Sequence, residues 1–198
     1  RAGGSFCNFV AQRVAGSNAL IVFDSYTNIA TERVRGLDFT VRWVKEIGPG
    51  TLRINGILTD YLEQANKLFP EDPFDEFNGT LNTPKYAATL DTTYTYHSWK
   101  VRYGLEWLSS MQSYDLFGLD KATTQFVLDV PNYYLHNISV QYRGDTWEAT
   151  AGINNIADRE PPKISSGISL YSRVGNAPLY SGYDYFGRTF FVNVTKRF

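Results

Sequence analysis

The sequence predicts an all-β fold: an antiparallel transmembrane β-barrel, to which this chain contributes seven or so strands. Three observations predict it. Apolar and polar residues alternate with period two in segments of about ten residues, the pattern and length of a membrane-crossing strand. Short and long connections alternate between these segments, like the turns and loops at the two ends of such a barrel. Aromatic residues make up 16 % of the chain, enough to cover a wall that meets lipid.

Seven segments show the alternation, each with one apolar and one polar face. The apolar faces are formed by Leu37, Phe39, Val41 and Trp43; Leu52, Ile54 and Leu58; Tyr86, Ala88, Leu90 and Tyr94; Trp99, Val101, Tyr103, Leu105 and Trp107; Ile138, Val140 and Tyr142; Trp147, Ala149, Ala151 and Ile153; and Phe190, Val192, Val194 and Phe198. Lys196 interrupts the last of these near the chain end, where a long side chain can reach the membrane surface.

The connections follow a short-long order. Residues 47–50, the break near His97, and residues 143–146 are expected to be tight turns, since Gly, Pro and Asp favour them. Between them lie long segments at roughly 64–83, 113–131 and 157–187. In an outer-membrane barrel the short turns face the periplasm and the long loops face outward.

A soluble β-sandwich also alternates and carries loops. Two features favour the membrane. Trp43, Trp99 and Trp147 stand on the apolar face beside short turns, where an interfacial girdle belongs. The polar face carries charges such as Arg42, Arg102 and Glu106, which do not suit the packed interior of a sandwich.

Other classes of protein are excluded or lack a signal. The chain has 19 basic and 20 acidic residues, dispersed along it, so no nucleic-acid partner is expected. No run of eighteen apolar residues exists to form a transmembrane helix, and the first residues lack the layout of a signal peptide. No nucleotide or metal motif is present, so neither a cofactor nor a metal is expected; the acidic cluster Glu71, Asp72, Asp75 and Glu76 lacks calcium-loop spacing.

The C-terminal stretch resembles the closing hairpin of TonB-dependent receptors. The residues that carry this resemblance are Asn155-Ile-Ala-Asp-Arg-Glu-Pro161 and the run from Gly187-Arg188 to Phe198, with Ala157 as an extra spacer in the first motif. Near the start, Phe6-Cys7, Arg13, Tyr26-Thr-Asn28 and Arg35-Gly-Leu-Asp38 are similar to a family stretch in which a cysteine-bearing outer loop feeds a long strand. That strand would run over 20–46 and be kinked near Gly36.

The resemblance implies that residues 1–198 are the C-terminal part of a larger barrel of about 22 strands. Its plug domain, TonB-contacting segment and earlier strands would lie outside this chain. A seven-stranded open sheet would leave two unpaired edges, which lipid does not tolerate. The implied partners are outer-membrane lipids and lipopolysaccharide, the TonB complex through the absent N-terminal part, the barrel-assembly machinery, and a nutrient ligand.

The implied function is TonB-dependent active uptake of a ferric siderophore, cobalamin or an oligosaccharide at the bacterial outer membrane, without enzymatic activity. Candidate ligand contacts lie on the long loops: Phe69, Asp72, Phe74, Asp75, Tyr114, Phe117, Tyr171, Arg173, Tyr180 and Tyr183. Rings and charges of this kind can stack on a ligand and hydrogen-bond its rim, although they can equally pack the loops together. Phe198 is the expected assembly signal, and Cys7 is expected to form a disulfide with an upstream cysteine.

Two alternatives stay open. A passive porin would have a complete barrel without a plug. An outer-membrane phospholipase would use Ser109 and His136, which are expected on the outer face at similar height, although no residue beside His136 is placed to orient it.

Overall fold

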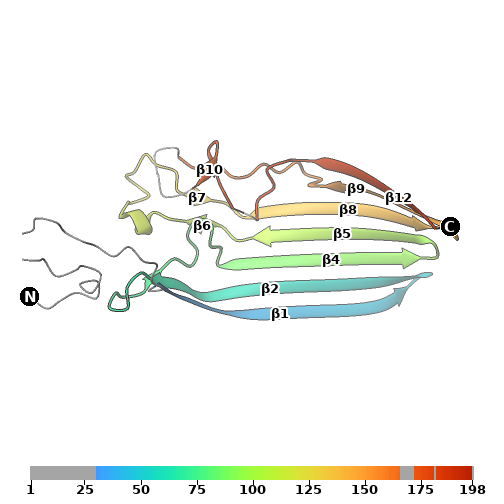
Figure 1. Ribbon diagram of the computed structural model, residues 1–198, viewed down its shortest axis with the longest axis horizontal. Helices are drawn as coiled ribbons and strands as arrows, with labels where there is room; N and C mark the ends of the chain where they lie inside the picture. The colour runs from blue at the N-terminus through green and yellow to red at the C-terminus, as the bar shows by residue number, and fades with distance from the viewer. Residues whose placement is uncertain (1–29, 166–171, 181, 198) are drawn as a thin grey trace, which may run out of the picture.

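Seven long strands form one antiparallel sheet in the computed structural model, which describes residues 30–165, 172–180 and 182–197 (Figure 1). They are β1 (Thr31–Ile47), β2 (Gly50–Lys67), β4 (Tyr86–Tyr96), β5 (Trp99–Leu108), β8 (Tyr133–Arg143), β9 (Trp147–Asn154) and β12 (Thr189–Lys196). Each pairs with the next along the chain. The predicted all-β antiparallel architecture and its seven strands are therefore confirmed. The sheet is open, because within the described residues β1 and β12 each have one neighbour.

Within the described residues, five short strands and one turn of 3-10 helix belong to the connections. β3 (Asp75–Glu76) extends the sheet beside β2, β6 (Met111–Gln112) pairs with β7 (Asp129–Val130), and β10 (Arg173–Val174) pairs with β11 (Ala177–Pro178). The helical turn η2 spans Asp115–Phe117. These elements are gathered at one end of the sheet, whereas the tight turns lie at the other (Figure 1). The predicted short-long order of connections is thus confirmed.

The turns form where the sequence allows a sharp reversal. Gly48 has a φ of 59°, a left-handed conformation that glycine adopts without strain. His97 takes a similar conformation with a φ of 50°. The third turn is closed by the Gly144 amide, which donates to the Trp147 carbonyl at 2.8 Å.

One predicted boundary needs correction, and one predicted irregularity has a counterpart in the structure. β2 continues to Lys67, so the first loop begins later than the predicted residue 64 because residues 63–67 pair with residues 31–35. The predicted kink near Gly36 corresponds to a register shift between Arg35 and Gly36, where Leu62 is the extra residue on β2. The expected extension of β1 back to residue 20 lies outside the described residues.

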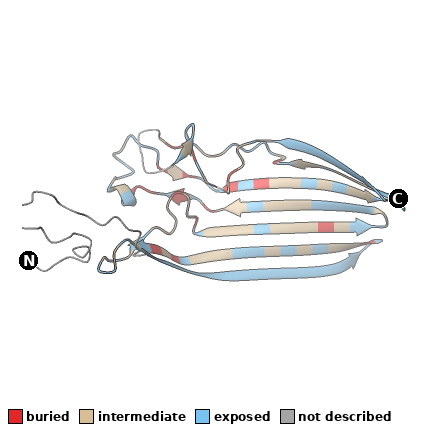
Figure 2. Cartoon of the chain, viewed as in Figure 1, coloured by how far each residue is buried: buried red, intermediate tan, exposed pale blue. Residues whose placement is uncertain are grey.

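The core of the protein lies beneath the loops. Figure 2 shows buried positions concentrated at the loop end, while most strand positions are intermediate or exposed. Leu81, Met111, Val130, Tyr133, Leu135, Ile164 and Tyr183 form the buried cluster. One face of the strands stays apolar and exposed: Phe190, Val192 and Val194 are 72 %, 75 % and 66 % exposed. A face of this kind suits contact with lipid.

Candidate functional site

The exposed apolar face carries the three tryptophans predicted to form a girdle. Trp43, Trp99 and Trp147 lie on β1, β5 and β9 and are 40 %, 50 % and 45 % exposed. Tyr142 joins two of them, since its ring lies 4.8 Å from that of Trp99 and 5.1 Å from that of Trp147. The three residues lie on the first, fourth and sixth of the seven long strands, each near the turn end.

The register places these tryptophans on one line that is inclined to the hydrogen-bonded rows. The row that contains Trp43 crosses β5 at Tyr103 and β9 at Ile153, four residues from Trp99 and six from Trp147. With about 3.3 Å per residue and about 4.8 Å between strands, both offsets give an incline of about 40°. The strands of a barrel are tilted by about 35–45° from its axis. Because the hydrogen-bonded rows are perpendicular to the strands, a plane parallel to the membrane makes the same angle with these rows. The line therefore has the geometry of a membrane interface, although contact with lipid stays a prediction.

A second aromatic group marks the upper edge of the apolar face. The rings of Trp107 and Tyr134 are stacked, with centroids 6.4 Å apart and an interplanar angle of 22°. Trp107 is eight residues along β5 from Trp99, which at this tilt is about 20 Å in height. The apolar band of a barrel is about 25 Å tall, so the two aromatic levels are spaced to bracket it.

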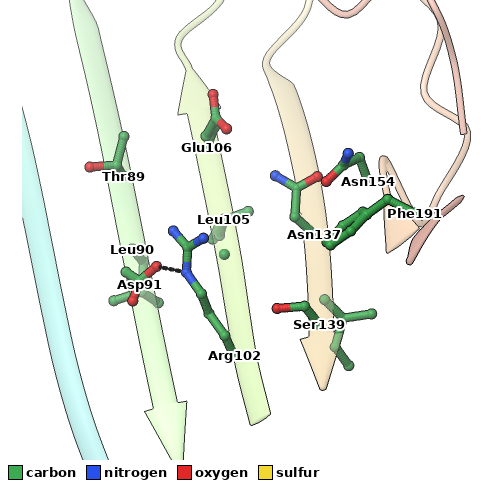
Figure 3. A pocket seen from close by; sticks show the side chains of 12 residues that line it. Thr89, Leu90, Asp91, Arg102, Leu105, Glu106, Asn137, Ser139, Asn154 and Phe191 are labelled. Carbon is green, nitrogen blue, oxygen red and sulfur yellow. Dashed lines mark hydrogen bonds and ion pairs between the residues drawn. The ribbon is translucent and has the colours of Figure 1, made fainter. Parts of the chain in front are cut away.

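The polar face has a concave surface in its upper half, the half nearer the loops. A depression of about 340 Å³ is lined by residues from β4, β5, β8, β9 and β12 (Figure 3). In it the Arg102 guanidinium donates to the Asp91 carboxylate, and Ser139 and Asn137 lie on the neighbouring strand (Figure 3). Arg102 is 61 % exposed, so the ion pair adds little stability and leaves both groups accessible to a partner.

The lower half of the same face is cationic. A second depression, of about 380 Å³, is lined by Arg53, Lys100 and Arg143 together with Thr, Asn and Gln side chains. Arg143 binds Glu148 at 2.8 Å, whereas no ion pair joins Arg53 or Lys100 to another residue of the described chain. The polar face thus offers charged and hydrogen-bonding groups along its height.

The last loop folds onto the polar side of the strands and is held there. The Tyr133 hydroxyl on β8 contacts the Asp184 amide at 3.2 Å, and the Asn155 side chain donates to the Asp184 carboxylate at 2.8 Å. Gly182 packs so closely on Leu108 that a Cβ there would come within 2.8 Å of it. Burial raises the pKa of the Tyr183 phenol. These loops form a packed platform above the polar face.

The middle loop has its own anchor. Asp129 accepts hydrogen bonds from Lys121 at 2.6 Å and from Tyr114 at 2.8 Å. The Lys121 ammonium holds the pKa of the Asp129 carboxyl below its usual range, and that carboxylate raises the pKa of Lys121. The Tyr114 hydroxyl also contacts the Leu128 amide at 3.2 Å. Tyr114 is 4 % exposed, so its role here is packing.

The structure distributes the predicted ligand contacts among several environments. Phe69 and Asp72 form a tight turn in the first loop, where Asp72 accepts from the Phe69 amide. The Phe74 ring lies 3.9 Å from the Arg33 guanidinium, and Asp75 is an exposed residue of β3. Phe117 is in η2.

The last loop holds the remaining predicted contacts. Arg173 donates to the Ser165 carbonyl at 3.3 Å, and Tyr180 is packed against the buried cluster that contains Tyr183. Tyr183, 5 % exposed, has a packing role like that of Tyr114. Tyr171 lies outside the described residues, as do Cys7 and Phe198, so the structure does not address those three predictions.

The predicted similar height of Ser109 and His136 is wrong. His136 pairs with Leu105, whereas Ser109 lies four residues beyond Leu105, just after the end of β5, about 13 Å along the strand direction. The Ser109 hydroxyl accepts from the Tyr86 amide at 3.1 Å, and His136 Nδ1 is bonded to the Tyr103 hydroxyl at 2.7 Å. Parity had placed both residues on one face, but height depends on strand register.

The structural roles of two residues were not predicted from the sequence. Asn155 is 1 % exposed and its side chain bonds Arg159 at both the amide and the carbonyl, which closes the connection after β9. Phe191 lies on the polar face, where its ring covers Gly152: a Cβ on Gly152 would come within 2.5 Å of that ring. The signal for this pairing is a glycine directly opposite an aromatic residue on the neighbouring strand. This signal can be recognised only once the register is known.

Two features are absent from the described residues. None of their helices is long and apolar enough to cross a membrane. They also contain no group of three or more His, Cys, Asp or Glu side chains placed to hold a metal ion.

Comparison with known proteins agrees with this architecture. The family model of the TonB-dependent receptor-like β-barrel matches residues 5–156. Two crystal structures of ferric enterobactin receptor variants from Pseudomonas aeruginosa are similar in fold, with 18 % identity and TM-scores of 0.53 and 0.52. The alignments cover 83 % and 82 % of this chain and 22 % of each solved chain. No curated protein matches the sequence.

The family match covers most of the chain, and the matched segment contains β1 to β9 of the sheet. Proteins of this family are transport receptors and not enzymes, which argues against the phospholipase alternative. This chain belongs to the family of TonB-dependent receptor β-barrels.

Proposed function

We propose that this chain forms part of the wall and mouth of an outer-membrane receptor that takes up a scarce nutrient by TonB-dependent active transport. The observation that carries the proposal is the combination of an apolar outer wall with a packed loop platform over a charged inner face. A passive pore needs no such platform, whereas a receptor needs a shaped surface for its ligand.

The chain would supply the last seven strands of a barrel of about 22, with the plug domain and earlier strands upstream. Support comes from the open edges of β1 and β12. Unpaired amide and carbonyl groups are costly in hydrocarbon, so further strands must cover both edges in a membrane. The TonB complex would act through the upstream part, and the barrel-assembly machinery would recognise the C-terminal Phe198.

The proposed ligand contacts are the predicted loop residues other than the buried Tyr114 and Tyr183: Phe69, Asp72, Phe74, Asp75, Phe117, Tyr171, Arg173 and Tyr180. The ligand would be a ferric siderophore, cobalamin or an oligosaccharide. The solved structures of similar fold are named as ferric enterobactin receptors, so ferric siderophores are the first class to test.

The experiment is uptake by cells that carry the complete receptor, with labelled ferric siderophores, cobalamin and oligosaccharides as separate substrates. We expect uptake of one class, dependent on TonB. Phe117→Ala and Arg173→Gln should weaken binding of that ligand about tenfold together, the effect of about 1.4 kcal/mol. The wall variant Val192→Ala is the matched control. Uptake that persists without TonB would show a passive channel and contradict the proposal.

A further inference from the structure

The three long loops at one end of the sheet share one buried core. They are the first loop (68–85), the middle loop (109–132) and the last loop (155–188), of which the structure describes 155–165, 172–180 and 182–188. The loops contribute five residues to the same buried cluster: Leu81 from the first, Met111 and Val130 from the middle, and Ile164 and Tyr183 from the last. The core is therefore complete only when the three loops are together.

Two hydrogen bonds join the first loop to the middle loop. The Gln112 amide donates to the Gly79 carbonyl at 3.0 Å, and the Leu81 amide donates to the Ser113 hydroxyl oxygen at 2.9 Å. Leu81 and Ser113 are both buried, so solvent does not replace the second bond when it breaks. A buried amide that loses its acceptor is costly, because its desolvation is no longer compensated. Ser113 is thus a buried link between two loops.

The last loop is joined to both of the others. The Ser165 amide donates to the Val127 carbonyl of the middle loop at 2.9 Å, and the Ser165 hydroxyl oxygen accepts from the Val127 amide at 2.8 Å. The first loop is reached through Asn82, whose side-chain amide donates to the Leu179 carbonyl at 3.3 Å. Each pair of loops is therefore connected by at least one hydrogen bond.

The two serines lie on one continuous chain of contacts. The Ser113 amide donates to the carbonyl of the buried Leu128 at 3.0 Å, and Leu128 follows Val127 in the sequence. Ser165 continues the chain, because its carbonyl accepts from Arg173 at 3.3 Å. The contacts thus lead from the first loop through the middle loop to Arg173 in the last. Packed and hydrogen-bonded neighbours of this kind can carry coupling between distant groups.

We propose that the three loops open and close as one cooperative unit, with Ser113 and Ser165 as the positioning residues that couple them. In such a unit a ligand that contacts one loop stabilises all three, because they share one opening equilibrium. Arg173, a proposed ligand contact, is bonded directly to Ser165. A surface that is already ordered also loses less conformational entropy on binding. The inference rests on the contacts among the loops and not on the transported nutrient.

The test is hydrogen exchange of backbone amides in the complete receptor, measured by mass spectrometry of loop peptides. The variant Ser113→Ala removes the acceptor of the Leu81 amide. The distant probes are the amides of Ile164 and Leu179 in the last loop, which donate to carbonyls of that same loop at 2.8 and 2.7 Å. We expect both to exchange about tenfold faster in the variant, because loss of one buried hydrogen-bond partner destabilises the whole unit.

Ser165→Ala tests the coupling in the opposite direction and replaces the first variant should Ser113→Ala not fold. Its distant probe is the Gly79 amide, which donates to the Thr83 carbonyl within the first loop at 2.8 Å. We expect faster exchange at Gly79 as well as in the last loop. The control is Asp120→Ala, which removes an exposed hydrogen bond to the Ala122 amide inside the middle loop. Its effect should stay local.

Two results would overturn the proposal. The first is faster exchange confined to the loops that contact the altered serine, with Ile164 and Leu179 unchanged in Ser113→Ala or Gly79 unchanged in Ser165→Ala. The second is an equal spread of faster exchange in Asp120→Ala, which would show general loosening without a role for the serines. Uptake assays on the unaltered receptor do not enter this measurement, so this proposal and the proposed function fail separately.

Discussion

Replacing Leu90 by Arg should destabilise the barrel, whereas replacing its neighbour Thr89 by Arg should not. The two residues are adjacent on β4 and point to opposite faces. Leu90 pairs with Gly56 and Leu105 on the apolar face. Thr89 is exposed on the polar face, directly opposite Glu106. The same side chain is thus introduced into two environments in one strand.

The tryptophan line sets the depth of Leu90. Interpolation between Trp43 on β1 and Trp99 on β5 places the tryptophan line near residue 95 of β4. The upper aromatic level, that of Trp107, lies eight residues away on β4, near residue 87. Leu90 is therefore within about 3 Å of the midplane in height. An arginine facing lipid at the midplane of a barrel costs about 2–4 kcal/mol. Thr89→Arg gains an opposite charge across the strand and should stay within about 0.5 kcal/mol of the unaltered receptor.

The assay is unfolding of the reconstituted receptor in urea, followed by tryptophan fluorescence. The expected result is a lower free energy of unfolding for Leu90→Arg with an unchanged slope against urea. Equal destabilisation by the two variants would refute the assignment of faces. A larger cost for Thr89→Arg would show that the apolar face lines the interior.

Four further predictions concern the loops and the chain ends. Tyr183→Phe should leave protease resistance of the last loop unchanged or improve it, because the buried Tyr183 hydroxyl has no partner in the described structure. Tyr133→Phe should weaken that resistance, by about 1 kcal/mol in the free energy of loop opening, since the Tyr133 hydroxyl contacts the Asp184 amide. A carboxyl whose pKa is lowered on folding adds stability above its unfolded pKa and loses it as the pH falls through the folded value. Hydrogen-exchange protection around Asp129 should therefore persist down to the usual Asp range and disappear below it, while Asp129→Asn lacks this step. Deletion of Phe198 should reduce the amount of folded, heat-modifiable receptor in the outer membrane, and equal amounts would count against its role in assembly. Cys7 should resist alkylation in the unreduced complete receptor, and quantitative labelling would show a free thiol instead.

Residue alternation alone was sufficient to predict the strands. Successive side chains of a strand point to opposite faces, so in a strand with one apolar face the sequence shows directly which residues lie on each face. The tight turns at 47–50 and 143–146 were equally readable, because glycine, proline and aspartate mark reversals wherever they occur. The family resemblance of the Asn155–Pro161 run rested on local residues in the same way. These features depend on neighbours in the chain and on little else.

The loop platform could not be predicted, because its contacts join residues far apart in the sequence. Tyr114 and Tyr183 resembled ligand contacts on loops, but each fills a buried position. Asn155 resembled part of a motif, yet its side chain closes one connection and anchors the last loop through Asp184. Composition shows that a loop is aromatic; only packing decides which rings are left for a ligand.

Relative height was also decided by the tertiary structure. The sequence determined which face each strand residue occupies, since that depends only on parity along the strand. It did not determine that Ser109 and His136 are separated, or that Trp43, Trp99 and Trp147 lie on one inclined line. These relations depend on register, and register is fixed by pairing between strands and not by either strand alone.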